Sequence, residues 1–292
     1  MESRLPPWFK QRGADPKVML PIEGLLDRLN LHTICKSALC PNIADCFSRK
    51  TATFLILGDV CTRYCTFCAV KKGRPLPIDD KEPQHLTEAA DKLNLNYVVI
   101  TSTTRDDLPD GGASHFIRTI HMLHERRPST YVEVLIPDFL GSSEAIRALV
   151  KSQPEVINHN LETVPRLYPQ VRPEADYSRS LSILSSVKKL NPKIVTKSGL
   201  MLGLGEETDE VLEVMKDLRK ANCDLLTLGQ YLQPSPQHLP VARYISPEEF
   251  RELGVTARKM GFAEAASMPL VRSSFRAAEL YRKARTAKTA GQ

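Results

Sequence analysis

The sequence predicts an α/β fold: a partial (β/α)6 barrel of the TIM type with an extension at each end. Short apolar runs rich in β-branched residues recur six times along the chain, and segments with helical periodicity separate them. This alternation is typical of parallel strands that are buried on both faces and joined by right-handed crossovers. With 292 residues and a hydrophobic content of 42%, the chain is long enough to bury one large core.

The expected strands are short and the expected helices are amphipathic. The strands are TFLIL (53–57), YVVIT (97–101), YVEVLIP (131–137), EVINHN (155–160), IVTKSGLML (194–202) and DLLTLGQY (224–231). Two segments between them, SHFIRTIHMLHERR (114–127) and TDEVLEVMKDLRKAN (208–222), carry apolar side chains at helical spacing. In the second segment the apolar face consists of Val211, Leu212, Val214, Met215 and Leu218.

These elements divide the chain into three parts. Residues 1–50 form an N-terminal extension, residues 51–232 form the barrel, and residues 233–292 form a C-terminal extension that begins with a proline-rich stretch. Polar clusters follow most of the expected strands. Because loops at the carboxyl ends of barrel strands build the active site of such folds, we expect the site at that end.

Charge and hydropathy exclude several classes of protein. The net charge of +6 is modest and spread along the chain, apart from the tail YRKARTAKTAGQ, which we expect to be solvated. A nucleic-acid partner is therefore not expected. No apolar run approaches the eighteen or so residues of a membrane span, and the N-terminus lacks the apolar region of a secretory signal. We expect a soluble cytoplasmic protein without a membrane partner.

Cysteine spacing carries the strongest chemical signal. Six of the seven cysteines fall into two triads, which are Cys35, Cys40 and Cys46, then Cys61, Cys65 and Cys68. The second triad has the spacing CxxxCxxC and directly follows the first expected strand. A zinc ribbon would show two CxxC knuckles, which are missing. Three thiolates on one short loop instead suit an iron–sulfur cube, because each sulfur binds a different iron and the fourth iron is left open. The seventh cysteine, Cys223, is expected in the core.

Longer motifs carry a resemblance to a known family. The CxxxCxxC loop, with Phe67 before its last cysteine, is similar to that of the radical S-adenosylmethionine (SAM) superfamily. Over residues 5–280 the chain resembles the lipoyl synthase family. The motifs that carry this resemblance are CPNIADC, TRDDLPDGGA, HNLETVPRLYPQVRP, KSGLMLGLGE, QYLQPSPQHLPV and PLVRSSFRA.

The resemblance implies two 4Fe-4S clusters and SAM as cofactors. Cys61, Cys65 and Cys68 would ligate the catalytic cluster, whose open iron binds the amino and carboxylate groups of SAM; electron transfer then yields a 5'-deoxyadenosyl radical. The first triad would hold an auxiliary cluster, with a serine of the family's RSSY motif as fourth ligand. Here the motif reads RSSF, with Phe275 in place of Tyr. The family pattern points to Ser274 rather than Ser273 as that ligand.

The resemblance also implies the reaction. A sulfurtransferase of this family inserts sulfur at C6 and C8 of an octanoyl chain that is amide-linked to a lysine of a lipoyl carrier domain, and it consumes the auxiliary cluster as sulfur donor. Those carbons carry no acidic proton, so acid–base catalysis cannot activate them and a radical must abstract hydrogen. Because a serine alkoxide matches iron less well than a thiolate does, we hypothesise that Ser274 is the ligand that dissociates.

Polar residues near the strand ends are candidate contacts for SAM or substrate, with structural capping as the alternative for each. They are Thr101, Ser102, Asn158, Asn160, Glu162, Lys197, Gln230 and Tyr231, together with Phe67 of the cluster loop. Glu162 is expected to bond a ribose hydroxyl. We expect three histidines, His115, His121 and His124, to pack or lie exposed on a helix outside the barrel. Arg172, Tyr177 and Arg179 are expected in a solvated loop, with contact to an acidic carrier domain as the alternative.

The expected partners follow from the reaction. They are octanoylated lipoyl carrier domains (a dehydrogenase-complex acyltransferase subunit or the glycine cleavage H protein), an electron donor such as flavodoxin or ferredoxin, and an iron–sulfur carrier that rebuilds the auxiliary cluster. Two alternatives stay open. A biotin-synthase-like sulfur inserter would lack the upstream triad and the RSS motif, and a two-cluster ferredoxin would be far shorter and would need further cysteines.

Overall fold

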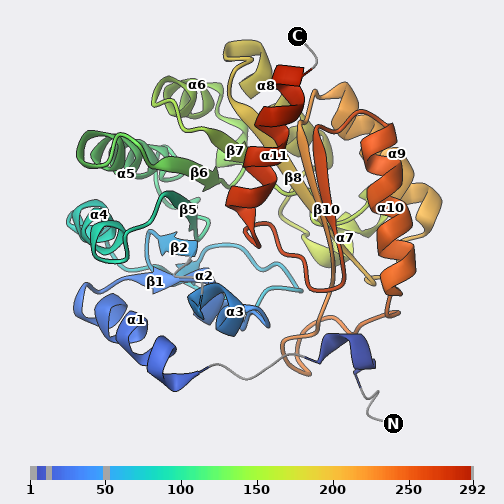
Figure 1. The fold of residues 1–292 in the computed structure, drawn as a ribbon, viewed down its shortest axis with the longest axis horizontal. Helices are drawn as coiled ribbons and strands as arrows, with labels where there is room; N and C mark the ends of the chain where they lie inside the picture. The colour runs from blue at the N-terminus through green and yellow to red at the C-terminus, as the bar shows by residue number, and fades with distance from the viewer. Residues whose placement is uncertain (1–4, 11–14, 49–52, 291–292) are drawn as a thin grey trace.

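The central element of the fold is one twisted sheet of eight strands, seen in a computed structural model that describes residues 5–10, 15–48 and 53–290. The sheet has the order β1-β2-β5-β6-β7-β8-β9-β10 and curves into an open barrel (Figure 1). Its strands are β1 (His32–Thr33), β2 (Thr53–Ile56), β5 (Tyr97–Ser102), β6 (Tyr131–Leu135), β7 (Val156–Asn158), β8 (Val195–Leu202), β9 (Leu225–Gln230) and β10 (Glu264–Ser267). A separate two-stranded ladder joins β3 (Val60–Cys61) to β4 (Lys71–Lys72).

The six predicted strands are all present and lie next to one another in the predicted parallel arrangement. Besides the separate β3–β4 ladder, the structure adds two strands to this sheet that the sequence did not predict. The strand β10 extends the parallel sheet beyond β9, and β1 pairs antiparallel with β2 at the other edge. The extensions therefore continue the sheet at both ends.

Helices cover both faces of the sheet, and all of them except α11 lie outside the inner face (Figure 1). The helices are α1 (Pro16–Arg28), α2 (Ile34–Ser37), α3 (Ile43–Ser48), α4 (Glu82–Lys92), α5 (Ala113–Arg126), α6 (Ser143–Lys151), α7 (Tyr168–Val171), α8 (Tyr177–Leu190), α9 (Thr208–Lys220), α10 (Pro247–Lys259) and α11 (Ala277–Ala290), with short 3-10 turns at Pro7–Phe9, Phe139–Gly141 and Pro165–Leu167. The expected apolar face of α9 is confirmed: Val211, Val214, Met215 and Leu218 are buried, and Leu212 is half-buried. Among the described helices none is long and apolar enough to cross a membrane.

The inner face of the barrel is also covered. In Figure 1 helix α11 lies in front of the sheet, close to β8 and β10, and it covers this inner face. Tyr281 and Ala284 of this helix are buried in a cluster with strand residues such as Val99 and Leu225. The expectation of a solvated tail is wrong for Tyr281 and Ala284, whereas the basic side chains of Arg282, Lys283 and Arg285 are exposed. The predicted boundary at residue 50 and residues 291–292 lie outside the described residues.

Candidate active site

A central cavity of about 300 Å³ opens at the carboxyl ends of the strands, where the sequence predicted the site. Cys61, Cys65 and Cys68 all line it. Side chains of a strand point alternately to its two faces, so Thr101 of β5 and Gly199 and Thr227 of the later strands also reach the cavity from inside the barrel. Apolar side chains complete the wall, among them Phe67, Leu135, Ile136, Met201 and Val271.

Hydrogen bonds fix the backbone of the cysteine loop from three sides. The amide of Thr104 donates to the Cys61 sulfur at 3.3 Å. The amide of Thr66 donates to the carbonyl of Val171 at 3.0 Å. On the third side, His238 Nε2 lies 3.1 Å from the Cys68 carbonyl. The loop is therefore held in place by contacts with the strand ends and with the C-terminal extension.

A buried network of charged side chains also holds the cysteine loop. The guanidinium of Arg63 donates to both Asp106 oxygens, at 2.6 and 3.0 Å, and to Asp138 at 2.6 Å. Asp138 also pairs with Arg179 at 3.1 Å. Burial raises the pKa of Asp138, but the hydrogen bond and charge of Arg63 outweigh this effect and lower the pKa to about 2. The network therefore stays ionised, and it joins the cysteine loop to the ends of β5 and β6.

The three thiols are arranged as an iron–sulfur cube requires, because Cys61, Cys65 and Cys68 line the wall of one cavity. In a cube each sulfur binds its own iron, so the thiols need not meet at one point. Burial raises the pKa of Cys65 to about 12 and that of Cys68 to about 11, so a cluster must displace their protons.

Five of the nine candidate contacts line this cavity. They are Phe67, Thr101, Ser102, Asn160 and Glu162. The Ser102 hydroxyl is buried without a hydrogen-bond partner among the described residues, as expected of a group that binds a ligand. Burial raises the pKa of Glu162, against the charge of Arg172 and a hydrogen bond from Asn160. Hydroxyl, amide and carboxyl groups thus meet next to the cysteine loop.

The other four candidates do not line the cavity, and each of them makes hydrogen bonds elsewhere in the fold. Lys197 lies fully buried below it and pairs with Glu133 at 2.8 Å. Asn158 donates to Glu133 as well, at 3.3 Å. Gln230 points to the outer face of β9 and bonds the backbone at Tyr231, Arg243 and Ile245. Tyr231 donates its hydroxyl to the Leu239 carbonyl at 2.7 Å. These four residues hold the barrel and its C-terminal extension together.

Sequence reasoning missed several residues of the cavity wall. They are Arg63, Asp138, Arg172, Arg272 and Ser273. Arg172 was expected in a solvated loop, and this expectation is wrong. Its guanidinium is buried and donates to the carbonyls of Asn160 and Leu161 at 2.8 and 3.1 Å. The position of Arg63 inside the CxxxCxxC loop was a signal that could have found it.

The neighbours of Arg172 in sequence are not in a solvated loop either. Tyr177 begins α8 and donates to Asp217 at 3.1 Å, and Arg179 pairs with Asp138. The expectation for the histidines is confirmed where the structure tests it. His115 is buried on α5, with Nε2 2.7 Å from Glu82, and the helix lies outside the sheet. Cys223 is fully buried, as predicted.

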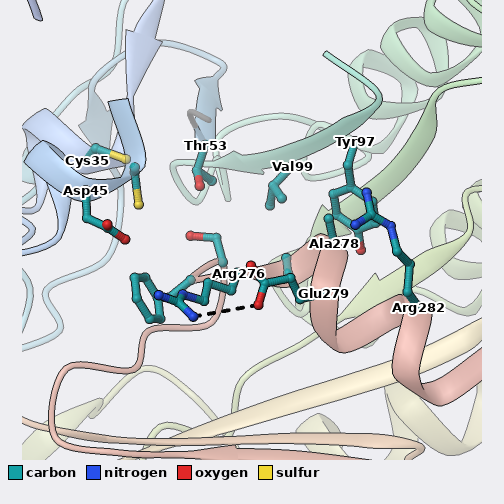
Figure 2. A pocket seen from close by; sticks show the side chains of 13 residues that line it. Cys35, Asp45, Thr53, Tyr97, Val99, Arg276, Ala278, Glu279 and Arg282 are labelled. Atoms are coloured by element: carbon teal, nitrogen blue, oxygen red, sulfur yellow. Dashed lines mark ion pairs between the residues drawn. The ribbon is translucent and has the colours of Figure 1, made fainter. Parts of the chain in front are cut away.

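A second pocket of about 250 Å³ lies between the N-terminal extension and the start of α11 (Figure 2). Cys35 and Cys46 of the upstream triad line it, and so does Ser274. Cys40 is close by, because its amide donates to the Cys35 carbonyl at 3.0 Å. Burial, together with the nearby Cys40, raises the pKa of Cys35 to about 11. The two cysteine triads therefore serve two different pockets.

Comparisons with known proteins agree with this geometry. The profile of the radical SAM superfamily matches residues 55–218, which run from β2 to α9. This superfamily uses a 4Fe-4S cluster and SAM. Among solved structures, Streptococcus suis SuiB bound to its precursor peptide SuiA has a TM-score of 0.57 at 12% identity, over 85% of this chain and 52% of that chain. Methylornithine synthase has a TM-score of 0.51 at 12% identity, over 82% of each chain. These two likenesses show the fold alone.

Curated relatives match nearly the whole chain. A lipoyl synthase of Caldanaerobacter subterraneus subsp. tengcongensis is 55% identical over 277 residues, which cover 95% of this chain and 97% of the relative. A lipoyl synthase of Caldicellulosiruptor saccharolyticus is 55% identical over 279 residues, covering 96% and 98%. The chain therefore belongs to the lipoyl synthase family of radical SAM sulfurtransferases.

Proposed function

We propose that this lipoyl synthase inserts sulfur with two separate iron–sulfur centres, one in each pocket. One observation carries the proposal: Ser273 lines the central cavity, whereas its neighbour Ser274 lines the second pocket with Cys35 and Cys46. A fourth ligand is thus available where the upstream triad leaves one iron free. The proposed ligands of the two centres are Cys61, Cys65 and Cys68 for the first, and Cys35, Cys40, Cys46 and Ser274 for the second.

The proposed substrate is an octanoyl chain on a lysine of a lipoyl carrier domain, with sulfur added at C6 and C8. Bound SAM would supply the radical that abstracts hydrogen from these carbons, and the auxiliary centre would supply sulfide. The chain's own residues aim the substrate and exclude water. Leu135, Ile136, Met201 and Val271 give the cavity an apolar wall that suits an alkyl chain and shields a reactive carbon from solvent.

We assign the polar wall of the cavity to SAM. Arg172 lies close enough to Cys65 to lower its pKa, although burial dominates that pKa. Its Nε is buried without a partner among the described residues, so it is available for the SAM carboxylate. The Ser102 hydroxyl, which has no partner among the described residues, and the Glu162 carboxyl are the groups that we assign to the amino group and the ribose.

The reaction needs outside partners. Reductive cleavage takes one electron for each SAM, for which we propose a flavodoxin or a ferredoxin as donor. Loss of sulfide from the auxiliary centre also requires an iron–sulfur carrier that rebuilds it. The carrier domains would be the acyltransferase subunit of a dehydrogenase complex or the glycine cleavage H protein. All seven cysteines are unbridged, which fits a reducing cytoplasmic setting.

The test is a product measurement. The protein is reconstituted anaerobically with iron and sulfide, then given SAM, a reductant and an octanoyl-lysine peptide, and the peptide is weighed by mass spectrometry. A gain that matches two sulfurs replacing two hydrogens supports the proposal. The loaded protein should hold about eight irons for each chain. Zinc in the purified protein, or a product with no sulfur, would refute the assignment.

A second variant tests the role of Ser274. Ser274→Cys replaces a hard oxygen ligand by a thiolate that iron holds more firmly. We expect the variant to keep its iron and to cleave SAM while transferring sulfur more slowly than the wild type. The matched control is Ser152→Ala, which removes a buried serine hydroxyl that follows α6 and, among the described residues, bonds the Leu149 carbonyl alone. A Ser274→Cys enzyme that inserts both sulfurs at the wild-type rate would contradict the hypothesis.

A further inference from the structure

Residues 268–276, here named the strap, connect β10 to α11 and pass across the mouth of the barrel. The structure fixes the first half of the strap on two sides. The amide of Gln230 donates to the Pro269 carbonyl at 3.0 Å. From the N-terminal extension, Asn42 Nδ2 donates to the Leu270 carbonyl at 2.6 Å, and Asn42 is buried. The strap therefore touches both the barrel and the loop that carries Cys40 and Cys46.

Two consecutive side chains of the strap enter different pockets. Ser273 lies in the central cavity, and Ser274 lies in the second pocket, whose wall Figure 2 shows with Cys35 and Asp45 facing Arg276 and Glu279. Consecutive side chains of an extended or turning backbone point in different directions, so anchoring one of them fixes the direction of the other. What holds Ser273 therefore also sets where Ser274 points.

The Ser273 hydroxyl is held by Asn160. Its Oγ lies 2.6 Å from Asn160 Nδ2 and 2.9 Å from Asn160 Oδ1, so it meets both atoms of the amide. Asn160 is itself held, because its Nδ2 donates to Glu162 Oε1 at 2.9 Å. The pair connects the strap to the residue that follows β7, across 113 positions of sequence. A contact of this kind fixes the strap against the barrel rather than against its own neighbours.

The barrel leaves room for this contact by having no side chain at Gly199. A Cβ placed there would lie 3.0 Å from Ser273 Oγ, 3.0 Å from Asn160 Oδ1 and 2.5 Å from Thr227 Oγ1. Those separations are shorter than ordinary contacts, so a larger residue would push the serine and the asparagine apart. The local packing is thus arranged around the Ser273–Asn160 contact.

We propose that Ser273 and Asn160 are positioning residues that hold Ser274 at the auxiliary centre. The inference rests on the proposed function, since it takes Ser274 to be a ligand of that centre. Neither positioning residue lines the second pocket, so they act on it only through the backbone of the strap. Without the contact, the strap between Leu270 and Ala277 would have more freedom, and Ser274 would dissociate from iron more often.

The test follows loss of iron from the anaerobically loaded enzyme to a ferrous chelator, without substrate. Wild type should release iron in two phases, and the phase that Ser274→Ala accelerates belongs to the auxiliary centre. We expect Ser273→Ala to accelerate the same phase about tenfold, within the range that loss of its two hydrogen bonds to Asn160 supplies, and to leave the other phase unchanged. Asn160→Ala should do the same. Ser273→Thr, which keeps the hydroxyl, should restore the slower rate, and Ser152→Ala should match the wild type.

The double variant Ser273→Ala/Asn160→Ala shows whether the two residues act through their shared contact, here named the latch, or act independently. Because both substitutions remove one contact, the double variant should release iron no faster than either single variant. Mössbauer spectra of enzyme loaded with ⁵⁷Fe should show less oxygen-ligated iron in all three variants. If Ser274→Ala changes release and spectrum but Ser273→Ala changes neither, the latch is refuted and the serine ligand stands. If Ser274→Ala also changes neither, the proposed auxiliary ligand is refuted together with the latch.

Discussion

Substitution of one glycine should destabilise the auxiliary centre and spare the catalytic one. Gly229 lies on the inner face of β9, directly beneath the strap. A Cβ at this position would lie 1.9 Å from the carbonyl oxygen of Val271 and 2.9 Å from its carbon. Ordinary contacts begin at 3.4 Å, so Gly229→Ala must push this backbone carbonyl outward by about 1.5 Å, the difference between 3.4 and 1.9 Å.

The size of the effect follows from what the strap loses when it moves. Overpacking of this kind costs about 1–3 kcal/mol. The displacement also breaks the bond from the Gln230 amide to the Pro269 carbonyl, and a buried N–H left unpaired costs about 1–3 kcal/mol more. The strap should therefore be destabilised by about 2–6 kcal/mol in its present position. That is enough to lift Ser274 away from Cys35 and Cys46 in most molecules.

The assay counts iron and follows SAM cleavage in the same preparation. We expect Gly229→Ala to lose iron from the auxiliary centre to a ferrous chelator at least as fast as Ser274→Ala does, to cleave SAM, and to transfer sulfur more slowly than the wild type. Gly24→Ala is the matched control. Gly24 lies inside α1, its nearest neighbour would be Arg28 Nη1 at 3.5 Å, and alanine favours a helix by about 1 kcal/mol. A Gly229→Ala enzyme with a full complement of iron and normal sulfur transfer would refute the reasoning.

Two further predictions concern buried charges. Lys197→Met leaves Glu133 buried without its cation, so the free energy of unfolding should fall by about 3–5 kcal/mol. Adding Glu133→Gln should restore much of this loss. Equal urea midpoints for the single and double variants would contradict the prediction. Burial and the charge of Arg172 lower the pKa of His159 to about 4. Between pH 6.5 and about pH 4, His159 therefore binds a proton in the unfolded chain but not in the folded chain. The free energy of unfolding should fall by about 1.4 kcal/mol for each pH unit in this range. His159→Gln should flatten this dependence in urea unfolding at about pH 7 and pH 5.5, and an unchanged slope would count against it.

Most of the strands could be predicted from sequence because each central strand is a near-continuous apolar run. The exceptions have physical reasons. The strand β10 has the sequence EAAS, which lacks both length and β-branched residues, and it forms because β9 offers a free edge. The strand β1 is two residues long, too short to give a pattern. In both, the pairing partner decides the conformation, and the sequence of the segment does not show that partner.

The faces of the strands were harder to predict than their positions. Along β9, Leu226 and Leu228 share one face with Gln230, while Leu225 and Thr227 share the other. Both faces are apolar because the sheet is covered on both sides, so the alternation did not show which face looks into the barrel. The prediction therefore assigned Gln230 to the cavity, whereas the structure turns it outward.

Charged residues were missed for a different reason. Arg172 was expected in solvent because a basic residue in a polar segment usually lies there. Its partners are two backbone carbonyls that only the folded turn after β7 brings together. Lys197 pairs with Glu133 from a strand 64 positions away. Residues that become partners across such separations in sequence leave no signal in the local sequence pattern. The pocket that Ser274 shares with Cys35 leaves no such signal either.

Ser273 and Ser274 line different pockets, so the number of residues in the strap matters more than the identity of most of them. Its ends are fixed, at Leu270 by Asn42 and at Ala277 by the start of α11, which is buried in the barrel. Adding or deleting one residue between these points would turn both serine side chains and exchange the pockets that they face. We therefore expect side-chain changes around the pair to be tolerated, and we expect an insertion here to separate the proposed sulfur donor from the central cavity.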